Sequence, residues 1–393
     1  AAFEWCCRTE EHDLGLRLVG ALGWYLWIRG DRAIGWAGVA RALDIQPARQ
    51  EPLRRVRALI WSCHLGAVGH HNHKIEPDSR VHGRQAVEIL ERLGMTHEVE
   101  YGHCMFVNAY ACYRDNCHGE GDVQVARALR LAAALGDNWL AACATIVAGI
   151  GHALRGEFID ADRRLRASAD HYRSAGDGWG ENRSLIWLSR TYEATGRLRQ
   201  AEDTAIAAVD LVRSLELGGA VVPLLAWIAR LRALQGDETG AAAALDAVEQ
   251  HRWWRKTSEG VGWIAESRAL LIEGRLAGSA DEALVREASR LHGLAATELA
   301  AAGLPVYAVH SRCRQVVWLA RAGESTVDAL DDATRLAHAQ GDRRADAILL
   351  DTMSVIADDS LAAARLRCQA DEHWRQLGLT RSLRFAADLD RLG

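Results

Sequence analysis

The histidines and cysteines between residues 63 and 118 have the widest range of possible chemistry in this chain. Imidazole and thiolate groups are the ligands that zinc prefers in proteins. No pair among them has the CxxC or HxxxH spacing that brings two ligands to one ion. The sequence therefore predicts surface histidines and buried thiols, with no metal and no cofactor, and leaves a zinc site, or an unrelated pH or redox effect, as the alternatives. The residues concerned are Cys63, His64, His70, His71, His73, His82, His97, His103, Cys104, Cys112, Cys117 and His118.

A second segment with binding chemistry starts at Arg252 and reads Arg-Trp-Trp-Arg-Lys. Two adjacent indoles flanked by three cations can stack on bases or bind an acidic partner. The alternative is that one indole packs in the core while the cations face water. We favour this alternative, because charged side chains beside a buried aromatic are common in folded chains.

Motifs for covalent or acid–base catalysis are weak. There is no GxSxG sequence. The pairs His103-Cys104 and Cys117-His118 are sequence neighbours, and adjacent positions of a helix point apart. The paired carboxylates Asp331-Asp332 and Asp358-Asp359 fall at expected helix boundaries, where they would cap the next helix. We therefore expect no catalytic residues and no enzymatic activity.

Composition restricts the class of protein. Of the 393 residues, 49% are hydrophobic and 25% are charged, which is typical of a folded chain and excludes wholesale disorder. A net charge of −5 without a basic tail argues against direct nucleic-acid binding. The nine cysteines are odd in number and lack CxxC, which favours free thiols in a reducing cytoplasm. No apolar run reaches the ~20 residues that a membrane span needs.

Tryptophan and the start of the chain add two expectations. There are 14 Trp against seven Tyr and four Phe, so some indoles should anchor packing or a binding surface. The sequence begins at Ala1, without Met, in a pattern that is already helical. We therefore expect it to be part of a longer protein.

A glycine period reveals the elements that position these side chains. Glycines recur at 136, 156, 176, 196 and 236, a step of 20 residues with one absence near 216. Several glycines are followed by Asp or Glu, including Gly30, Gly121, Gly323 and Gly341. Glycine ends a helix in the left-handed conformation, and the acid then caps the next helix. The pattern predicts antiparallel helical hairpins in which each helix has about 16 residues.

Two such helices form a unit of about 40 residues. Relative to Gly156, Gly196 and Gly236, a small residue follows five positions later, as at Ala201 and Ala241. Small residues at fixed places let helices approach, and larger apolar ones fill the gap to the next hairpin. We expect a core that contains Leu22, Leu26, Leu165, Leu188, Tyr192, Ile228 and Leu245.

These features resemble the tetratricopeptide repeat (TPR), with an aromatic at Tyr192, a turn glycine and alanines at fixed offsets, although the unit exceeds the ~34 residues of the standard repeat. The longer unit is similar to the arrays of bacterial signal-transduction ATPases. Certain runs resemble the C-terminal TPR region of actinobacterial transcriptional regulators, the Streptomyces antibiotic regulatory protein (SARP) type and its ATPase relatives. The runs are Ala1-Ala2-Phe3-Glu4-Trp5, Leu14-Gly15-Leu16-Arg17-Leu18, Ala21-Leu22-Gly23-Trp24-Tyr25-Leu26-Trp27, Arg29-Gly30-Asp31 and Ala175-Gly176-Asp177-Gly178-Trp179-Gly180.

The resemblance implies a fold and a role. We expect an all-α, right-handed TPR-like superhelical solenoid of about 18–20 antiparallel helices over residues 1–393, with an irregular loop near 70–82 and a break near 252–262. The ATPase and DNA-binding modules of such regulators would precede this chain, which has no GxxxxGK[ST] loop. The implied role is a protein-interaction and sensor array in transcription regulation. A small-ligand receptor with a pocket inside the superhelix is the runner-up, and a metal-dependent enzyme is third.

The repeat register also selects a binding surface. In TPR-like units the first helix of each hairpin lines the concave face, and positions six and thirteen before the turn glycine share that face. Arg183 and Arg190 have these positions before Gly196, and Arg230 is six before Gly236. Arginine beside an indole suits carboxylates and phosphates. The alternative is that the arginines bond to Glu193 or Glu181 within the array. The expected set, which would bind an acidic peptide, a module of the parent protein or a small anionic effector, is Arg183, Trp187, Arg190, Trp227 and Arg230.

Overall fold

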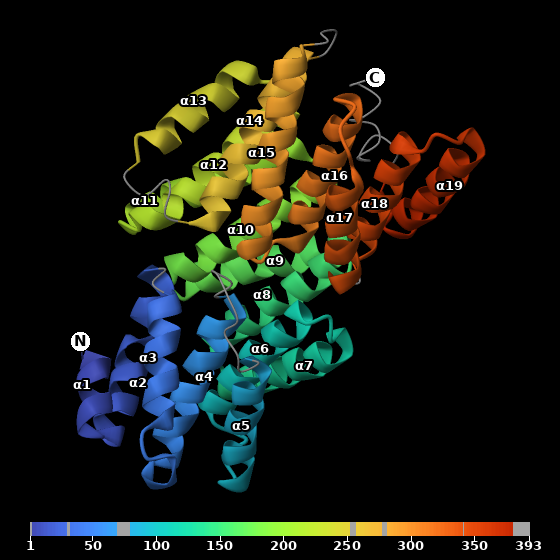
Figure 1. The fold of residues 1–393 in the computed structure, drawn as a ribbon. Helices are drawn as coiled ribbons and strands as arrows, with labels where there is room; N and C mark the ends of the chain where they lie inside the picture. The colour runs from blue at the N-terminus through green and yellow to red at the C-terminus, as the bar shows by residue number, and fades with distance from the viewer. Residues whose placement is uncertain are drawn as a thin grey trace. The chain divides into compact units, whose positions relative to one another are not determined.

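The computed structural model describes residues 2–29, 32–68, 79–251, 257–276, 281–340 and 342–379. Within these ranges the chain forms nineteen α-helices and one short 3₁₀ helix, Pro47–Arg49, and no strand (Figure 1). The all-α class and the expected number of helices are confirmed. None of the helices in the described ranges is long and apolar enough to cross a membrane.

The period of 20 residues is confirmed over seven consecutive helices. They are α7 (His118–Leu135), α8 (Asn138–Leu154), α9 (Phe158–Ser174), α10 (Gly178–Ala194), α11 (Leu198–Ser214), α12 (Gly218–Leu234) and α13 (Glu238–Glu249). Before them come α1 (Ala2–Thr9), α2 (His12–Arg29), α3 (Arg32–Asp44), α4 (Pro52–Val68), α5 (Ser79–Arg92) and α6 (Val99–Arg114). After them come α14 (Ser258–Leu276), α15 (Glu282–Ala301), α16 (Pro305–Arg321), α17 (Val327–Gln340), α18 (Arg343–Ile356) and α19 (Ser360–Gln376).

The turns between these helices have the expected chemistry. The periodic glycines have φ between +65° and +78°, the left-handed region that ends a helix. The carboxylates of Asp137, Asp177 and Asp237 each accept a hydrogen bond from the backbone N–H three residues later, at 2.8–2.9 Å. Where the period lacks a glycine, Glu216 takes the same conformation with φ +56°.

One predicted turn is wrong. Gly121 lies inside α7 and is buried, and its N–H donates to the carbonyl of Cys117. Glycine is needed there for a different reason: a Cβ atom would lie 2.6 Å from Cε1 of Tyr113, whose ring packs against the helix. Gly30 and Gly341 lie outside the described residues.

The turn conformation predicts opposite effects at two equivalent positions. Changing Gly196, at φ +72°, to valine should lower the free energy of unfolding by about 1 kcal/mol or more, because a β-branched side chain is strained there. Changing Glu216 to glycine should raise it by up to ~1 kcal/mol. Urea unfolding followed by circular dichroism measures both. A Glu216→Gly variant that is less stable than the parent would contradict this explanation of the period.

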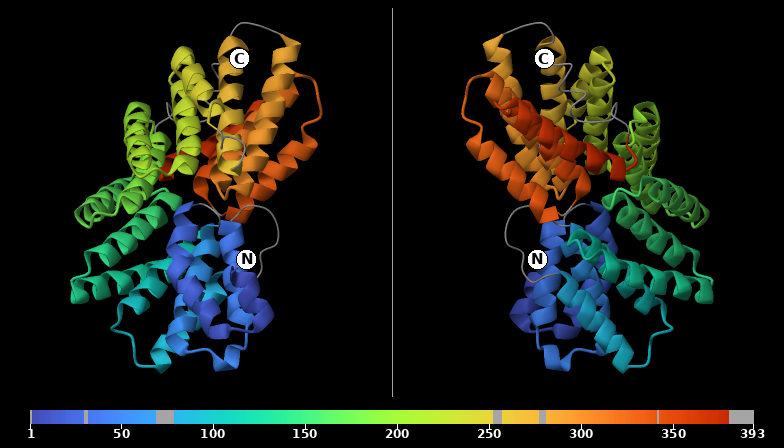
Figure 2. Two further views of the ribbon diagram at one scale, coloured as in Figure 1. Left: turned by 90° about the vertical axis from the view of Figure 1, so that its left-hand side faces the viewer. Right: turned by 90° about the vertical axis from the view of Figure 1, so that its right-hand side faces the viewer.

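The described residues divide into two compact units. Unit 1 contains residues 1–152, 160–184 and 215–219, and unit 2 contains residues 153–159, 185–214 and 220–393. In unit 1, α2 packs on α3, α4 on α5 and α6 on α7, and α4 also contacts both α2 and α6. In unit 2, α15 packs on α14 and α16, and α16 also contacts α18. Figures 1 and 2 show α6 beside α7 and α15 beside α16. Contacts between alternate helices are what a stacked hairpin array requires.

Most of the expected core is buried. Leu165, Leu188, Tyr192, Ile228 and Leu245 are buried, whereas Leu22 and Leu26 are only half-buried. Of the residues expected in the two interruptions, 79–82 belong to α5 and 258–262 belong to α14. Residues 69–78 and 252–256 lie outside the described ranges. A single superhelix over the whole chain stays a prediction.

Candidate functional site

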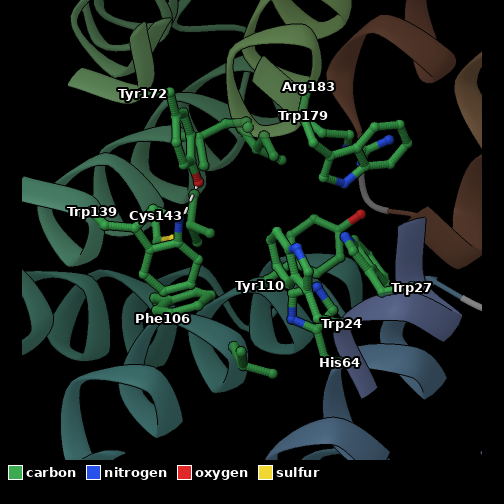
Figure 3. A pocket seen from close by; sticks show the side chains of 15 residues that line it. Trp24, Trp27, His64, Phe106, Tyr110, Trp139, Cys143, Tyr172, Trp179 and Arg183 are labelled. Atoms are coloured by element: carbon green, nitrogen blue, oxygen red, sulfur yellow. Dashed lines mark hydrogen bonds between the residues drawn. The ribbon is translucent and has the colours of Figure 1, made fainter. Parts of the chain in front are cut away.

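Unit 1 contains a cavity of about 80 Å³ whose wall is mostly aromatic (Figure 3). The wall is supplied by α2, α4, α6, α8 and α10, the first helices of successive hairpins, with one residue from α9. Its lining residues are Trp24, Trp27, His64, Phe106, Val107, Tyr110, Trp139, Cys143, Ile146, Val147, Ile150, Tyr172, Trp179, Gly180 and Arg183.

The aromatic rings of this wall meet edge to face. The ring centroids of Trp24 and Trp139 are 5.8 Å apart with an interplanar angle of 70°, and those of Phe106 and Trp139 are 6.4 Å apart at 78°. Trp27 meets His64 at 3.8 Å and 74°. Such pairs are favourable beyond the area they bury, so the wall is well ordered before any ligand arrives.

The polar groups of the wall are mostly neutral and bonded within the protein. The Tyr172 hydroxyl donates to Sγ of Cys143 at 3.2 Å. Burial raises the pKa of both groups, so both stay protonated at neutral pH. Burial also lowers the pKa of His103, whose ring packs on Trp139, which favours the neutral imidazole. Arg183 is the charged side chain among the lining residues.

One donor in the wall lacks a partner, and the repeat explains why. Trp139 and Trp179 are 40 residues apart in equivalent positions. Nε1 of Trp139 donates to Oδ2 of Asp177 at 2.8 Å. The residue equivalent to Asp177 for the second indole is Leu217, whose side chain cannot accept a hydrogen bond. Trp179 is 7% exposed, and its Nε1 has no hydrogen-bond partner among the described residues.

The expected set of binding residues divides between the two units. Arg183 lines the aromatic cavity of unit 1, and its place on a concave binding face stays a prediction. The same register rule, applied from Gly30 and Gly156, selects Arg17, Trp24, Cys143 and Ile150, and the last three line the cavity. Sequence reasoning missed these residues because the rule was applied only from Gly196 and Gly236.

The other arginines of the set are bound within unit 2. Arg230 is 1% exposed, with its guanidinium 3.3 Å from Oε1 of Glu193 and 3.1 Å from Oε1 of Glu266. This pairing with Glu193 is the alternative that the sequence left open. Arg190 pairs with Glu259 at 2.6 Å.

The two tryptophans of the set lie beside these arginines. The guanidinium of Arg190 lies 5.4 Å from the centre of the Trp187 ring, and that of Arg230 lies 4.9 Å from the centre of the Trp227 ring. Nε1 of Trp227 donates to Oγ of Ser189 at 2.9 Å. A partner-binding role for Trp187, Arg190, Trp227 and Arg230 stays a prediction.

The structure describes only part of the histidine- and cysteine-rich stretch between residues 63 and 118. His70, His71 and His73 lie outside the described residues, as does the Arg252–Lys256 segment. In the described part of the chain, no three His, Cys, Asp or Glu side chains are grouped so that they could hold a metal ion. Cys63, Cys104 and Cys112 are buried, and all nine cysteines are free thiols.

Comparisons with known proteins identify the fold. No family model matches the chain, and no curated protein matches it. The solved Rap conjugation gene regulator of plasmid pLS20, in complex with the Phr* peptide, superposes with a TM-score of 0.57 and 10% identity over 92% of this chain and 96% of that one. A Rap protein complexed with Competence and Sporulation Factor gives a TM-score of 0.51 and 12% identity, covering 82% of this chain and 76% of that one. The fold is therefore that of TPR-like helical repeat proteins.

A third solved structure is more distant. It is a Signal Transduction ATPase with Numerous Domains from Pyrococcus horikoshii, which carries a tetratricopeptide repeat sensor. Its TM-score is 0.39 at 14% identity, and the match covers 91% of this chain but about half, 54%, of that one.

Proposed function

We propose that this chain is the recognition array of a regulatory protein and that it binds an extended peptide or protein segment at the aromatic cavity of unit 1. The cavity carries the proposal, because five successive first helices contribute to one apolar wall with a cation in it. Extended segments laid along first helices are what a stacked array can bind. The two Rap structures support this role, since one was solved with a peptide and the other with a Competence and Sporulation Factor.

The size of the cavity favours a segment over a whole metabolite. Its volume is about 80 Å³. Sites for small molecules usually measure ~300–1,000 Å³, and an engineered cavity of ~150 Å³ holds benzene. This cavity therefore accepts one small aliphatic side chain, while the rest of the ligand lies outside it.

Two polar groups define the rest of the ligand. The indole N–H of Trp179 is a buried donor without a partner, which costs ~1–3 kcal/mol, so an acceptor oxygen on the ligand would recover that cost. A peptide carbonyl is such an acceptor. Arg183 adds a positive charge that suits a carboxylate in the same segment. The ligand that fits is an acidic segment with a Val-, Leu- or Ile-like side chain.

The wider biological role belongs to the same proposal. The chain would be the C-terminal sensor of a multidomain actinobacterial transcriptional regulator of the SARP or signal-transduction-ATPase type. It would act in the cytoplasm without catalysis of its own, and it would report the bound segment to ATPase and DNA-binding modules. The runs quoted from Ala1–Trp5 and Ala175–Gly180 support this assignment.

Arg190 and Arg230 rank second as docking residues. An acidic partner would have to displace Glu259 from the first and Glu193 and Glu266 from the second. That exchange loses as many ion pairs as it makes, and neither residue lines the aromatic cavity, so we assign first recognition to the cavity.

The test starts with short random peptides displayed on phage and selected against the full chain. Selected peptides should share an aliphatic residue and an acid, and Arg183→Glu should weaken their binding about tenfold or more. The matched control is Arg163→Glu, whose side chain in α9 is 71% exposed and should change affinity by less than about twofold. Fluorescence anisotropy measures each affinity.

A second variant tests the unpartnered indole. Leu217→Asp should give Trp179 the carboxylate that Asp177 gives Trp139, and it should weaken peptide binding about tenfold without lowering the melting temperature. Unchanged affinity in both Leu217→Asp and Arg183→Glu would contradict the proposal. So would a metabolite that stabilises the chain in a screen where no peptide binds.

A further inference from the structure

A backbone hydrogen bond joins two cysteines, Cys112 and Cys117, across the end of α6. Asn116 has φ +59°, its N–H donates to the carbonyl of Tyr113 at 3.2 Å, and the N–H of Cys117 donates to the carbonyl of Cys112 at 2.8 Å. This pair of bonds is the Schellman motif, which frequently brings the side chains of its first and last residues together. Here those residues are Cys112 and Cys117, with backbones close enough for a disulfide.

The two thiols have different surroundings. Cys117 is half-buried and stands at the first position before α7, and Nη1 of Arg80 lies 3.1 Å from its sulfur. Arg80 is held by Asp115, with Nε 2.7 Å from Oδ2. A partly exposed sulfur beside a guanidinium is a setting typical of reactive cysteines.

Cys112, in contrast, has surroundings that keep its thiol protonated. It is fully buried, and burial together with the nearby carboxylate of Glu120, which accepts a hydrogen bond from the thiol, raises its pKa to about 12. The site therefore combines a half-buried sulfur next to a cation with a buried, protonated thiol close by.

We propose that this pair is a redox-sensitive modification site, in which Cys117 reacts with a hydroperoxide and Cys112 then closes a disulfide. The site is independent of the cavity and of the proposed ligand. A partly exposed thiol near a cation with a second thiol close by is the arrangement that redox-sensing cysteines use.

The chemistry needs only the peroxide as oxidant. The Cys117 sulfur attacks one peroxide oxygen, the O–O bond breaks, and the sulfur becomes a sulfenic acid while the second oxygen leaves, once protonated, as water or an alcohol. The Cys112 sulfur then attacks the Cys117 sulfur, the S–O bond breaks, and the hydroxyl leaves as water with the proton of the Cys112 thiol. The peroxide is reduced and the two thiols are oxidised to one disulfide.

The experiment treats the full chain with hydrogen peroxide, blocks the remaining thiols and maps tryptic peptides by mass spectrometry. Trypsin cuts after Arg114, so the disulfide should join peptide 93–114 to peptide 115–127. Cys112→Ser should instead leave a sulfenic acid on Cys117 that dimedone labels. Arg80→Ala should slow the loss of the Cys117 thiol about tenfold. Circular dichroism checks that each variant is folded.

Cys368 provides the matched control, since it is exposed on α19. Cys368→Ser should leave the cross-link unchanged, and in the parent Cys117 should be consumed several-fold faster than Cys368. Equal rates at the two thiols would overturn the proposal, as would folded Cys112→Ser protein without dimedone label.

Discussion

Replacing Arg230 by alanine should lower the free energy of unfolding by about 3–5 kcal/mol. The guanidinium is fully buried between Glu193 and Glu266, and the rings of Trp227, Trp263 and Tyr307 lie within 5.5 Å of it. Burial alone would raise the pKa of Glu266, but the charge of Arg230, together with the hydrogen bond from His310 and the nearby histidine charges, lowers it. Removing Arg230 therefore leaves a buried carboxylate without its counter-ion, which costs far more than the pair itself contributes.

The measurement is the urea midpoint of Arg230→Ala against that of Arg290→Ala. Arg290 also pairs with a glutamate, at 2.7 Å, but its side chain is 61% exposed, and its loss should cost less than about 0.5 kcal/mol. Equal midpoints for the two variants would mean that Arg230 is not the buried counter-ion described here.

Lowering the pH should also lower the free energy of unfolding, because Glu273 then becomes protonated. Its carboxylate accepts from Nε1 of Trp318 at 2.6 Å, pairs with His292 at 2.8 Å and is in contact with Arg314. Burial alone would raise the pKa of Glu273, but the charge of Arg314, and then that of His292, lowers it from 4.5 to about 2. A tenfold change in acidity is worth about 1.4 kcal/mol, so ionised Glu273 contributes about 3 kcal/mol at neutral pH.

The sign of the pH dependence follows from the lowered pKa. The contribution is complete above pH 4.5, the ordinary value, and is lost as the pH falls towards about 2. Glu273→Gln should therefore be clearly less stable than the parent at pH 7, and the difference should shrink by about 2 kcal/mol at pH 3. Urea unfolding at the two pH values measures this. If Glu273→Gln is less stable than the parent by the same amount at pH 7 and at pH 3, the charge of Glu273 is not what stabilises unit 2.

The helical array could be predicted from the sequence because its signal is local. A left-handed glycine followed by a capping acid needs only neighbouring residues, so the starts of α8 to α13 follow from the glycine period. The turn predicted at Gly121 was wrong because the Gly-Asp pair also occurs inside helices. The glycine is needed there because the Tyr113 ring packs against it, and this contact cannot be predicted from neighbouring residues in the sequence.

The candidate site was predictable only in part. The register of the first helices gave Arg183 and, applied from Gly30 and Gly156, would have given Trp24, Cys143 and Ile150 together with Arg17, which does not line the cavity. The absent partner of Trp179 is also visible in the sequence once Trp139 is known to bond to Asp177.

The burial of Arg230 could not be predicted. It depends on a network whose members are far apart in sequence: Glu193 also pairs with Arg344, 151 residues later, at 3.2 Å. No repeat or motif marks such a pair, because the contact is made by the stacking of separate hairpins.

Hydrogen–deuterium exchange of the full chain, with and without a peptide selected against it, tests the central proposal most directly. The proposal predicts slower exchange in α6, in α8 and in the first half of α10, whose residues line the cavity, and the same protection should be lost in Arg183→Glu. Protection confined to the segments around Arg190 and Arg230 would place the partner on unit 2 instead and would contradict recognition at the aromatic cavity.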